Sequence, residues 1–495
     1  MQIKNKFLIK SLLFDNRTLK QTLFKNTFWL AFTEGVIKVL KLILFIYVAR
    51  ILGSEGYGKF SFALAFIGLF TILSTLGLPR IIVREFSQKK EKKEKEFISI
   101  LSLKLLLSIG TLAIIAIGSF FITDDAIIRR IILILAVFTL IDSFTSFLNF
   151  FFQAQQKMEH ESWTRIFRAL VLTISGLLVI LFFPSVENLS YSYLFSALIA
   201  LIPILIFFHF KVYRLSFSLE KGIWKKYLLM SWPIAAAGIF STIYGQIDSV
   251  IMGYLKQITE TGWYNAAYRI MGAALIPVGF ISTSFYPALS NAFQESKERF
   301  QKTWDYQMGL LIIFFVPVVV GGIVLAPKII NFIYGAAYLP ATLAFQLLIV
   351  TVGFSFLQSP FNQALLILNR EKKILWVNSI GVLVNVSLNL VLIPRFSLYG
   401  AALVMVITSL IILLLSIVFT HQTRLIKILD AKIITNTILI LFSAFIMYLA
   451  ISYQHIYNLN VVLTIILGSA VYFTVLLSGK FLIKYFSYYR NRLYE

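Results

Sequence analysis

Three ionisable side chains recur at helical spacing in an apolar segment near the start of the chain. At about 100° per residue, Glu34, Lys38 and Lys41 lie within roughly 60° of one another and form a stripe on one helix face. Two ammonium groups on one face suit an anionic ligand, which favours a cavity lined by this stripe. The competing interpretation is an internal Glu34–Lys38 ion pair, with Lys41 extended toward more polar surroundings.

Polar side chains also share faces of three later apolar segments. Asp248 either lines the same cavity or pairs with Arg269. The stripe that contains Asp142 and Asn149 is either an interhelical hydrogen-bonding seam or the wall of a wet cavity. The primary candidates for a substrate-binding cavity are Glu34, Lys38, Lys41, Asp248, Tyr268 and Arg269, and the secondary candidates are Arg50, Lys59, Asp142, Asn149, Tyr244 and Asn265.

The stretch GSEGYGKF at 53–60 is one hydroxyl short of a phosphate-binding P-loop. A P-loop needs a buried strand before it and a Ser or Thr after the lysine to hold Mg²⁺. Here an apolar helical segment precedes the stretch, and Phe60 follows Lys59. We therefore predict a tight turn whose glycines adopt positive φ, with no nucleotide site. No cofactor is expected, and any energy that the protein uses would come from an ion gradient such as that of H⁺ or Na⁺, from the membrane potential or from its substrate's own gradient.

Residues that carry enzyme chemistry are sparse. The chain has no cysteine, which excludes disulfides, iron–sulfur clusters and thiol catalysis. Its four histidines are scattered without metal-ligand spacing, and no carboxylate pair beside an apolar segment resembles a glycosyltransferase's acidic motif. Asp124 and Asp125 are adjacent in a short turn, where capping of the next helix is the expected role. The sequence predicts neither an enzyme nor a metal site.

The elements that must position these residues are membrane helices. Hydrophobic residues make up 59% of the 495 residues, charged residues only 14%, and mean hydropathy is +0.85. Apolar runs long enough to cross a bilayer recur along the whole chain, so we predict an all-α, polytopic membrane protein. Fourteen spans are predicted, at 28–50, 58–78, 97–121, 127–152, 166–183, 189–208, 227–254, 263–288, 308–326, 339–368, 375–393, 398–420, 433–453 and 459–481.

The distribution of basic residues predicts the orientation. With the N-terminus in the cytoplasm, 34 of the 45 Lys and Arg residues fall in inner segments, where the positive-inside rule retains them. We therefore place both termini in the cytoplasm, with the chain in the cytoplasmic membrane. The net charge of +23 is then mostly an orientation signal that also attracts anionic membrane lipids, and no nucleic-acid partner is expected.

Two intramembrane sets are expected to have structural roles. Asn378, Asn385 and Asn389 are interpreted as an interhelical hydrogen-bonding seam. Lys104 lies a turn or two from the inner end of its span, so its side chain is expected to extend to the membrane surface.

An internal repeat is also indicated. Gly56-Tyr57 and Gly262-Trp263 each open a span, and each of these spans ends near a proline, Pro79 or Pro287. Two six-helix halves would place the first and seventh spans in corresponding positions around a central cleft. The predicted division is a basic cytoplasmic segment at 1–26, a first bundle at 27–210, a cytoplasmic linker at 211–226, a second bundle at 227–421, an additional helix pair at 432–485 and a cytoplasmic tail at 486–495.

Several stretches resemble one family of membrane proteins. They are YVARILGSEGYGKFSFA from position 47, LGLPRIIVREFS at 76–87, QIDSVIMGYL and TGWYNAAYRI within 246–270, FYPALS at 285–290 and, more weakly, YGAAL at 399–403. In these stretches the chain is similar to bacterial polysaccharide or O-antigen repeat-unit flippases of the multidrug, oligosaccharidyl-lipid and polysaccharide exporter superfamily. The resemblance covers nearly the whole chain.

The resemblance implies a flippase in which two six-helix bundles form a V-shaped pair, and this pair alternates between inward-open and outward-open states. Its cargo would be an anionic lipid-linked glycan on undecaprenyl pyrophosphate, and a polysaccharide polymerase and a chain-length regulator would be possible protein partners. In the lipid II branch, cations from the first, second and eighth helices line the cavity, and the terminal helix pair forms a groove for the lipid tail. Arg269 falls where the eighth-helix arginine would lie, whereas Lys38 and Lys41 replace arginines of that branch.

Three alternatives remain open at this stage. A lipid II flippase would share the fold and the basic cavity. A multidrug or cation antiporter would be expected to line its cavity mainly with carboxylates. A membrane polysaccharide polymerase is the enzyme alternative, and the short predicted outer loops count against it.

Overall fold

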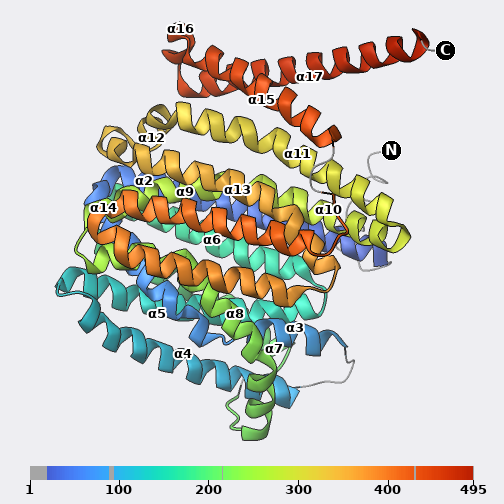
Figure 1. The fold of residues 1–495 in the computed structure, drawn as a ribbon. Helices are drawn as coiled ribbons and strands as arrows, with labels where there is room; N and C mark the ends of the chain where they lie inside the picture. The colour runs from blue at the N-terminus through green and yellow to red at the C-terminus, as the bar shows by residue number, and fades with distance from the viewer. Residues whose placement is uncertain (1–18, 89–93, 215, 428–430, 494–495) are drawn as a thin grey trace, which may run out of the picture. The chain divides into compact units, whose positions relative to one another are not determined.

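The computed structural model describes residues 19–88, 94–214, 216–427 and 431–493, which form helices joined by short connections (Figure 1). The chain divides into two compact units, Met1–Gly262 and Trp263–Glu495. Within lipid, an α-helix satisfies its backbone hydrogen bonds internally, which explains why apolar runs of this length fold as helices.

The first unit contains seven long or medium helices and one 3₁₀ turn among its described residues. They are α2 (Leu19–Thr71), η1 (Ile72–Ser74), α3 (Leu78–Gln88), α4 (Glu94–Ile122), α5 (Ala126–Ala154), α6 (Met158–Phe182), α7 (Val186–Lys211) and α8 (Lys221–Tyr254). In this unit α2 packs against α5, α6 and α8, and α7 packs against α5 and α6 (Figure 1).

The second unit begins within α9 (Ile258–Ala274), because the boundary between the units falls inside that helix. In this unit α13 packs against α11 and α14, and the terminal helices α15 and α17 lie side by side with α15 against α11 (Figure 1). The remaining elements are α10 (Ile276–Glu295), α11 (Lys297–Val324), α12 (Ala326–Tyr334), η2 (Ala336–Ala341), α13 (Thr342–Ile367), α14 (Glu371–His421), α15 (Ala431–Ser452), α16 (Gln454–Tyr457) and α17 (Val461–Leu493).

The all-helical, polytopic fold predicted from hydropathy is confirmed. Most predicted spans coincide with a helix, with two consecutive elements, or with one arm of a bent helix, as the first span does in α2; the second span, 58–78, covers the end of α2, η1 and the first residue of α3. Within the described residues, ten helices are long and apolar enough to cross a membrane, and Asn436–Ser452 is a shorter apolar helix. Asp125 caps α5 as predicted, since its carboxylate accepts hydrogen bonds from the N–H groups of Ile127 and Ile128.

Two long helices each contain a sharp bend. In α2 the bend lies at Gly53, whose φ is 67°, and in α14 it lies at Ser397, whose φ is 52°. The predicted glycine turn is therefore present at Gly53, where positive φ favours glycine. Gly56 and Gly58 have negative φ and continue the helix, so the expectation that they also supply positive φ was wrong.

Gly58 has a different role, because it permits a close crossing of two helices. A Cβ atom at Gly58 would lie 1.9 Å from the carbonyl oxygen of Ile258, and one at Gly262 would lie 2.0 Å from that of Ser54. Each glycine thus faces the residue four positions before the other glycine. Small residues at such positions let helix backbones approach closely in a membrane.

Aromatic contacts hold the first unit together near one end of α4, α5 and α7. The ring of Phe97 lies 5.1 Å from Phe151 and 5.8 Å from Phe208, measured between centroids, and all three side chains are buried. Such pairs contribute beyond the area they bury. They fix α5 in the unit and so position the polar residues that α5 presents to α6.

Candidate functional site

A ladder of polar contacts joins α5 to α6 in the first unit. Asp142 forms an ion pair with Arg168, whose guanidinium also lies 3.5 Å from Ser146 Oγ. Asn149 Oδ1 accepts a hydrogen bond of 2.8 Å from Thr164 Oγ1. The predicted stripe of Asp142, Ser146, Asn149 and Gln153 on α5 therefore forms hydrogen bonds and an ion pair to α6, as an interhelical seam does.

The partners on α6 were not identified from the sequence. Glu161, Thr164, Arg165 and Arg168 recur at helical spacing, but the fifth span was predicted to begin at Ile166, which placed most of them in a loop. The helix begins eight residues earlier, at Met158, as its bounds show. Testing the polar stretch before the apolar run for the same periodicity would have revealed the stripe.

Arg165 links this ladder to the charged stripe of α2. Its guanidinium forms an ion pair with Glu34 and another, of 3.3 Å, with Glu161. Glu161 is almost fully buried, with 4% of its side chain exposed, and accepts a 2.9 Å hydrogen bond from Gln153 Nε2. One guanidinium therefore bridges two carboxylates from two helices, as its planar fork of donors allows.

The two lysines of the α2 stripe are exposed. Among the described residues no ion pair is recorded for Lys38, so the alternative Glu34–Lys38 pair is not formed. Lys41 is also exposed, and Glu34 is half-exposed. A charge inside a membrane costs roughly 2.5–3.5 kcal/mol when it faces lipid, which favours water or a ligand beside these ammonium groups.

The two secondary basic candidates lie near the Gly53 bend of α2. Arg50 is exposed, whereas Lys59 forms an ion pair of 2.9 Å with Glu55 and a second contact of 3.9 Å with Asp125. Lys59 is therefore held by carboxylates of its own unit.

The remaining candidates fall in both units. Asp248 is buried and Tyr244 half-buried on α8 of the first unit. Asn265, Tyr268 and Arg269 are half-buried on α9 of the second unit, where the rings of Tyr264 and Tyr268 lie 5.9 Å apart. Their assignment to a common substrate-binding cavity stays a prediction.

Lys104 is not at the membrane surface, so the expectation that it extends there was wrong. Its side chain has no exposed surface, and its ammonium donates to the hydroxyls of Ser74 at 3.2 Å, Ser108 at 3.0 Å and Ser143 at 2.8 Å. The Lys104 ammonium thus donates one hydrogen bond to a serine hydroxyl of each of η1, α4 and α5. This contact joins three segments that sequence periodicity could not bring together.

Only part of the predicted interhelical asparagine seam is present in the second unit, and its amide–amide hydrogen bond lies within one arm of α14. Asn389 Nδ2 donates to Asn385 Oδ1 at 3.1 Å, and Asn385 Nδ2 lies 3.8 Å from Met405 Sδ across the bend of α14. Both asparagines are fully buried, whereas Asn378 is exposed and takes no part.

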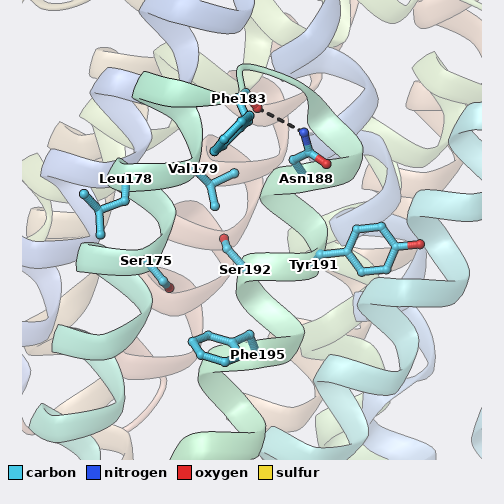
Figure 2. A pocket seen from close by; sticks show the side chains of 8 residues that line it. All are labelled: Ser175, Leu178, Val179, Phe183, Asn188, Tyr191, Ser192 and Phe195. Atoms are coloured by element: carbon cyan, nitrogen blue, oxygen red, sulfur yellow. Dashed lines mark hydrogen bonds between the residues drawn. The ribbon is translucent and has the colours of Figure 1, made fainter.

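Two pockets differ in their chemistry. A pocket of about 520 Å³ between α6 and α7 is lined by Ser175, Leu178, Val179, Phe183, Asn188, Tyr191, Ser192 and Phe195, and Figure 2 shows Asn188 donating to the Phe183 carbonyl. This pocket has no charged lining residue. A second, of about 540 Å³ in the second unit, combines Lys302, Asp305 and Lys480 with apolar side chains of α11 and α15.

Ten helices of the described residues are long and apolar enough to cross a membrane, and α2 exposes the cations of Lys38 and Lys41, so the fold is that of a polytopic membrane protein. The chain belongs to the polysaccharide biosynthesis protein family, whose model matches residues 23–293. The family expected from the sequence stretches is thus confirmed.

Relatives and solved structures agree with this membership. The chain is 25% identical to an uncharacterized membrane protein of Methanocaldococcus jannaschii, over 87% of this chain and 90% of the relative. It is 23% identical to a probable low-salt glycan biosynthesis flippase of Haloferax volcanii, over 38% of this chain and 41% of the relative. The fold is similar to that of a lipid II flippase in an inward closed conformation, with a TM-score of 0.76, 15% identity and coverage of 92% and 99%. The fold is also similar to that of an inward-facing multidrug resistance MATE family transporter of the MOP superfamily, with a TM-score of 0.65, 15% identity and coverage of 79% and 94%.

Proposed function

We propose that the protein flips a lipid-linked oligosaccharide repeat unit, carried on undecaprenyl pyrophosphate, from the cytoplasmic to the outer leaflet by alternating access. Membership of the polysaccharide biosynthesis family supports a glycan-linked cargo. The observation that carries the proposal is the exposed Lys38 ammonium on α2, within the predicted span 28–50, because a cation there suits the pyrophosphate of the carrier.

The proposal extends to the surroundings of the site. Lys41 and Arg269 would contribute further positive charge, and the pocket between α11, α15 and α17 would offer an apolar surface to the carrier's tail. The protein would act in the cytoplasmic membrane with both termini inside. A polysaccharide polymerase and a chain-length regulator would take over the exported units.

Deleting the gene tests this function directly. We expect the deletion strain to accumulate its lipid-linked glycan in the cytoplasmic leaflet, where an impermeant glycan-oxidising reagent cannot reach it, and to lose the surface polysaccharide. Lipid II accumulating in place of that glycan would support a lipid II flippase. Unchanged glycan export with increased sensitivity to cationic drugs would overturn the proposal in favour of a multidrug antiporter.

A further inference from the structure

The charged stripe of α2 contains an ion pair that helix geometry favours but the protein does not form. Glu34 and Lys38 are four residues apart, with the acidic residue nearer the N-terminus, the arrangement in which such pairs form most readily. Instead, Glu34 pairs with Arg165 of α6, and Lys38 is exposed with no ion pair recorded among the described residues.

Arg165 is well suited to hold Glu34. Its guanidinium is three-quarters buried, with 24% of the side chain exposed, and it is fixed from behind by Glu161. Glu161 in turn is held by Gln153 of α5. A planar guanidinium can serve two carboxylates at once, whereas the ammonium of Lys38 is a single point charge on a flexible stem.

We infer that Arg165 is a positioning residue that keeps Glu34 away from Lys38 and so leaves the Lys38 ammonium available to an anionic headgroup. This inference rests on the proposed function, since it names how the same site is prepared for its cargo. Arg165 contacts no cargo in this arrangement. It acts through Glu34, the only acidic residue of the α2 stripe.

The test measures binding of undecaprenyl pyrophosphate to the purified full-length protein in detergent by native mass spectrometry, with uncharged undecaprenol as reference ligand. Arg165→Gln releases Glu34 to pair with Lys38, and we expect the Kd for the pyrophosphate to rise roughly two- to fivefold, the range that a partly exposed ion pair imposes. Glu34→Gln removes the carboxylate that Arg165 restrains, so its Kd is the reference for the double variant. The double variant Arg165→Gln/Glu34→Gln should recover the Kd of Glu34→Gln, and undecaprenol should bind all variants equally.

A purely structural role gives a different pattern. If Arg165 only cross-links α2 to α6, Glu34→Gln alone should weaken binding as much as Arg165→Gln, and the double variant should not recover. Either result overturns the inference. Arg130→Gln is the matched control, because it breaks an ion pair of 3.0 Å with Glu187 that joins α5 to α7 away from the stripe.

Two further variants keep the outcome decisive. Arg165→Gln leaves the buried Glu161 carboxylate without its cation, so the comparison is repeated in a Glu161→Gln background if the single variant does not fold. Lys38→Ala distinguishes an error in the proposed binding site from an error in the positioning role of Arg165. If Lys38→Ala binds pyrophosphate as well as the wild type, the proposed site itself is wrong. If it loses binding while Arg165→Gln has no effect, only the positioning role is wrong.

Discussion

Lys104 of α4 donates a hydrogen bond to Ser143 of α5 across 2.8 Å, at a site with no exposed surface. No carboxylate pairs with Lys104 among the described residues, so serine hydroxyls alone solvate its ammonium. Two of the three hydroxyls donate their own protons to backbone carbonyls: Ser74 donates to Thr71 and Ser108 donates to Lys104. The arrangement satisfies a protonated lysine without a counter-ion.

Ser143→Ala should therefore destabilise the protein, by about 1–3 kcal/mol, because it leaves one buried donor of Lys104 unsatisfied. Lys104→Met should be neutral or stabilising, since it removes the buried polar group together with its need for partners. Thermal unfolding in detergent measures both. Ser119→Ala is the control, because the one hydrogen bond that buried Ser119 forms to the described part of the chain goes to the carbonyl of Ala116 in its own helix. A Ser143→Ala protein as stable as the control would contradict this account.

Gly58→Ala and Gly262→Ala should each disrupt the helix crossing. The added methyl group would meet a backbone carbonyl oxygen at about 2 Å, and a backbone cannot rotate aside as a side chain can. We expect each substitution to lower the free energy of unfolding by at least about 1–3 kcal/mol, the usual cost of overpacking. Gly110→Ala, which would meet nothing within 4 Å on α4, should be neutral. Unfolding temperatures of the three purified variants give the comparison, and equal values would refute the close crossing.

Lys38→Ala and Arg269→Ala should lower transport by about ten- to a hundredfold, because a hydrogen bond to a charged group contributes about 1.5–3 kcal/mol. Membrane insertion should persist, since removing a charge from a span lowers its insertion cost. Lys256→Ala is the control, as Lys256 is 81% exposed in the connection after α8. Transport of the labelled lipid-linked glycan into the outer leaflet is the readout. Normal transport by both variants would exclude the assigned cavity.

The membrane potential should accelerate export if the cargo carries its pyrophosphate charge. Moving a doubly charged headgroup outward across about 100 mV, with the cytoplasm negative, gains roughly 4.6 kcal/mol at about 2.3 kcal/mol per charge. A potassium diffusion potential imposed on vesicles of known orientation, with a valinomycin-only control at zero gradient, measures the effect. Flipping that is indifferent to the sign of the potential would rule out this source of energy.

Much of the fold follows from local sequence properties. Hydropathy alone locates the helices, because each membrane crossing needs a long apolar run whatever its neighbours are. The need of Asn385 and Asn389 for partners was also predictable, since a buried amide in a membrane requires a hydrogen-bonding partner, but their mutual bond within α14 was not. The predicted starts of helices were less accurate where the first turns are polar, as in α6, because the apolar run begins only after those turns.

The contacts between helices were not predictable in the same way. Lys104 was expected at the surface because reaching it is the commonest solution for a lysine near a helix end. The serines that bury it come from η1 and α5, which only the tertiary fold brings to α4. Likewise, the spacing of Glu34 and Lys38 suggested either a pair or a cavity wall, and the choice depends on Arg165, a residue more than a hundred positions away.

The ladder between α5 and α6 bears on how the chain enters the membrane during synthesis. Arg168 and Asp142 belong to consecutive helices joined by only a few residues, so they can meet while both are still beside the translocon. A lone α6 would carry Arg168 into lipid without its carboxylate partner, at a cost of roughly 2.5–3.5 kcal/mol. The two helices therefore have reason to partition into the bilayer as a preformed hairpin, with their charges already neutralised.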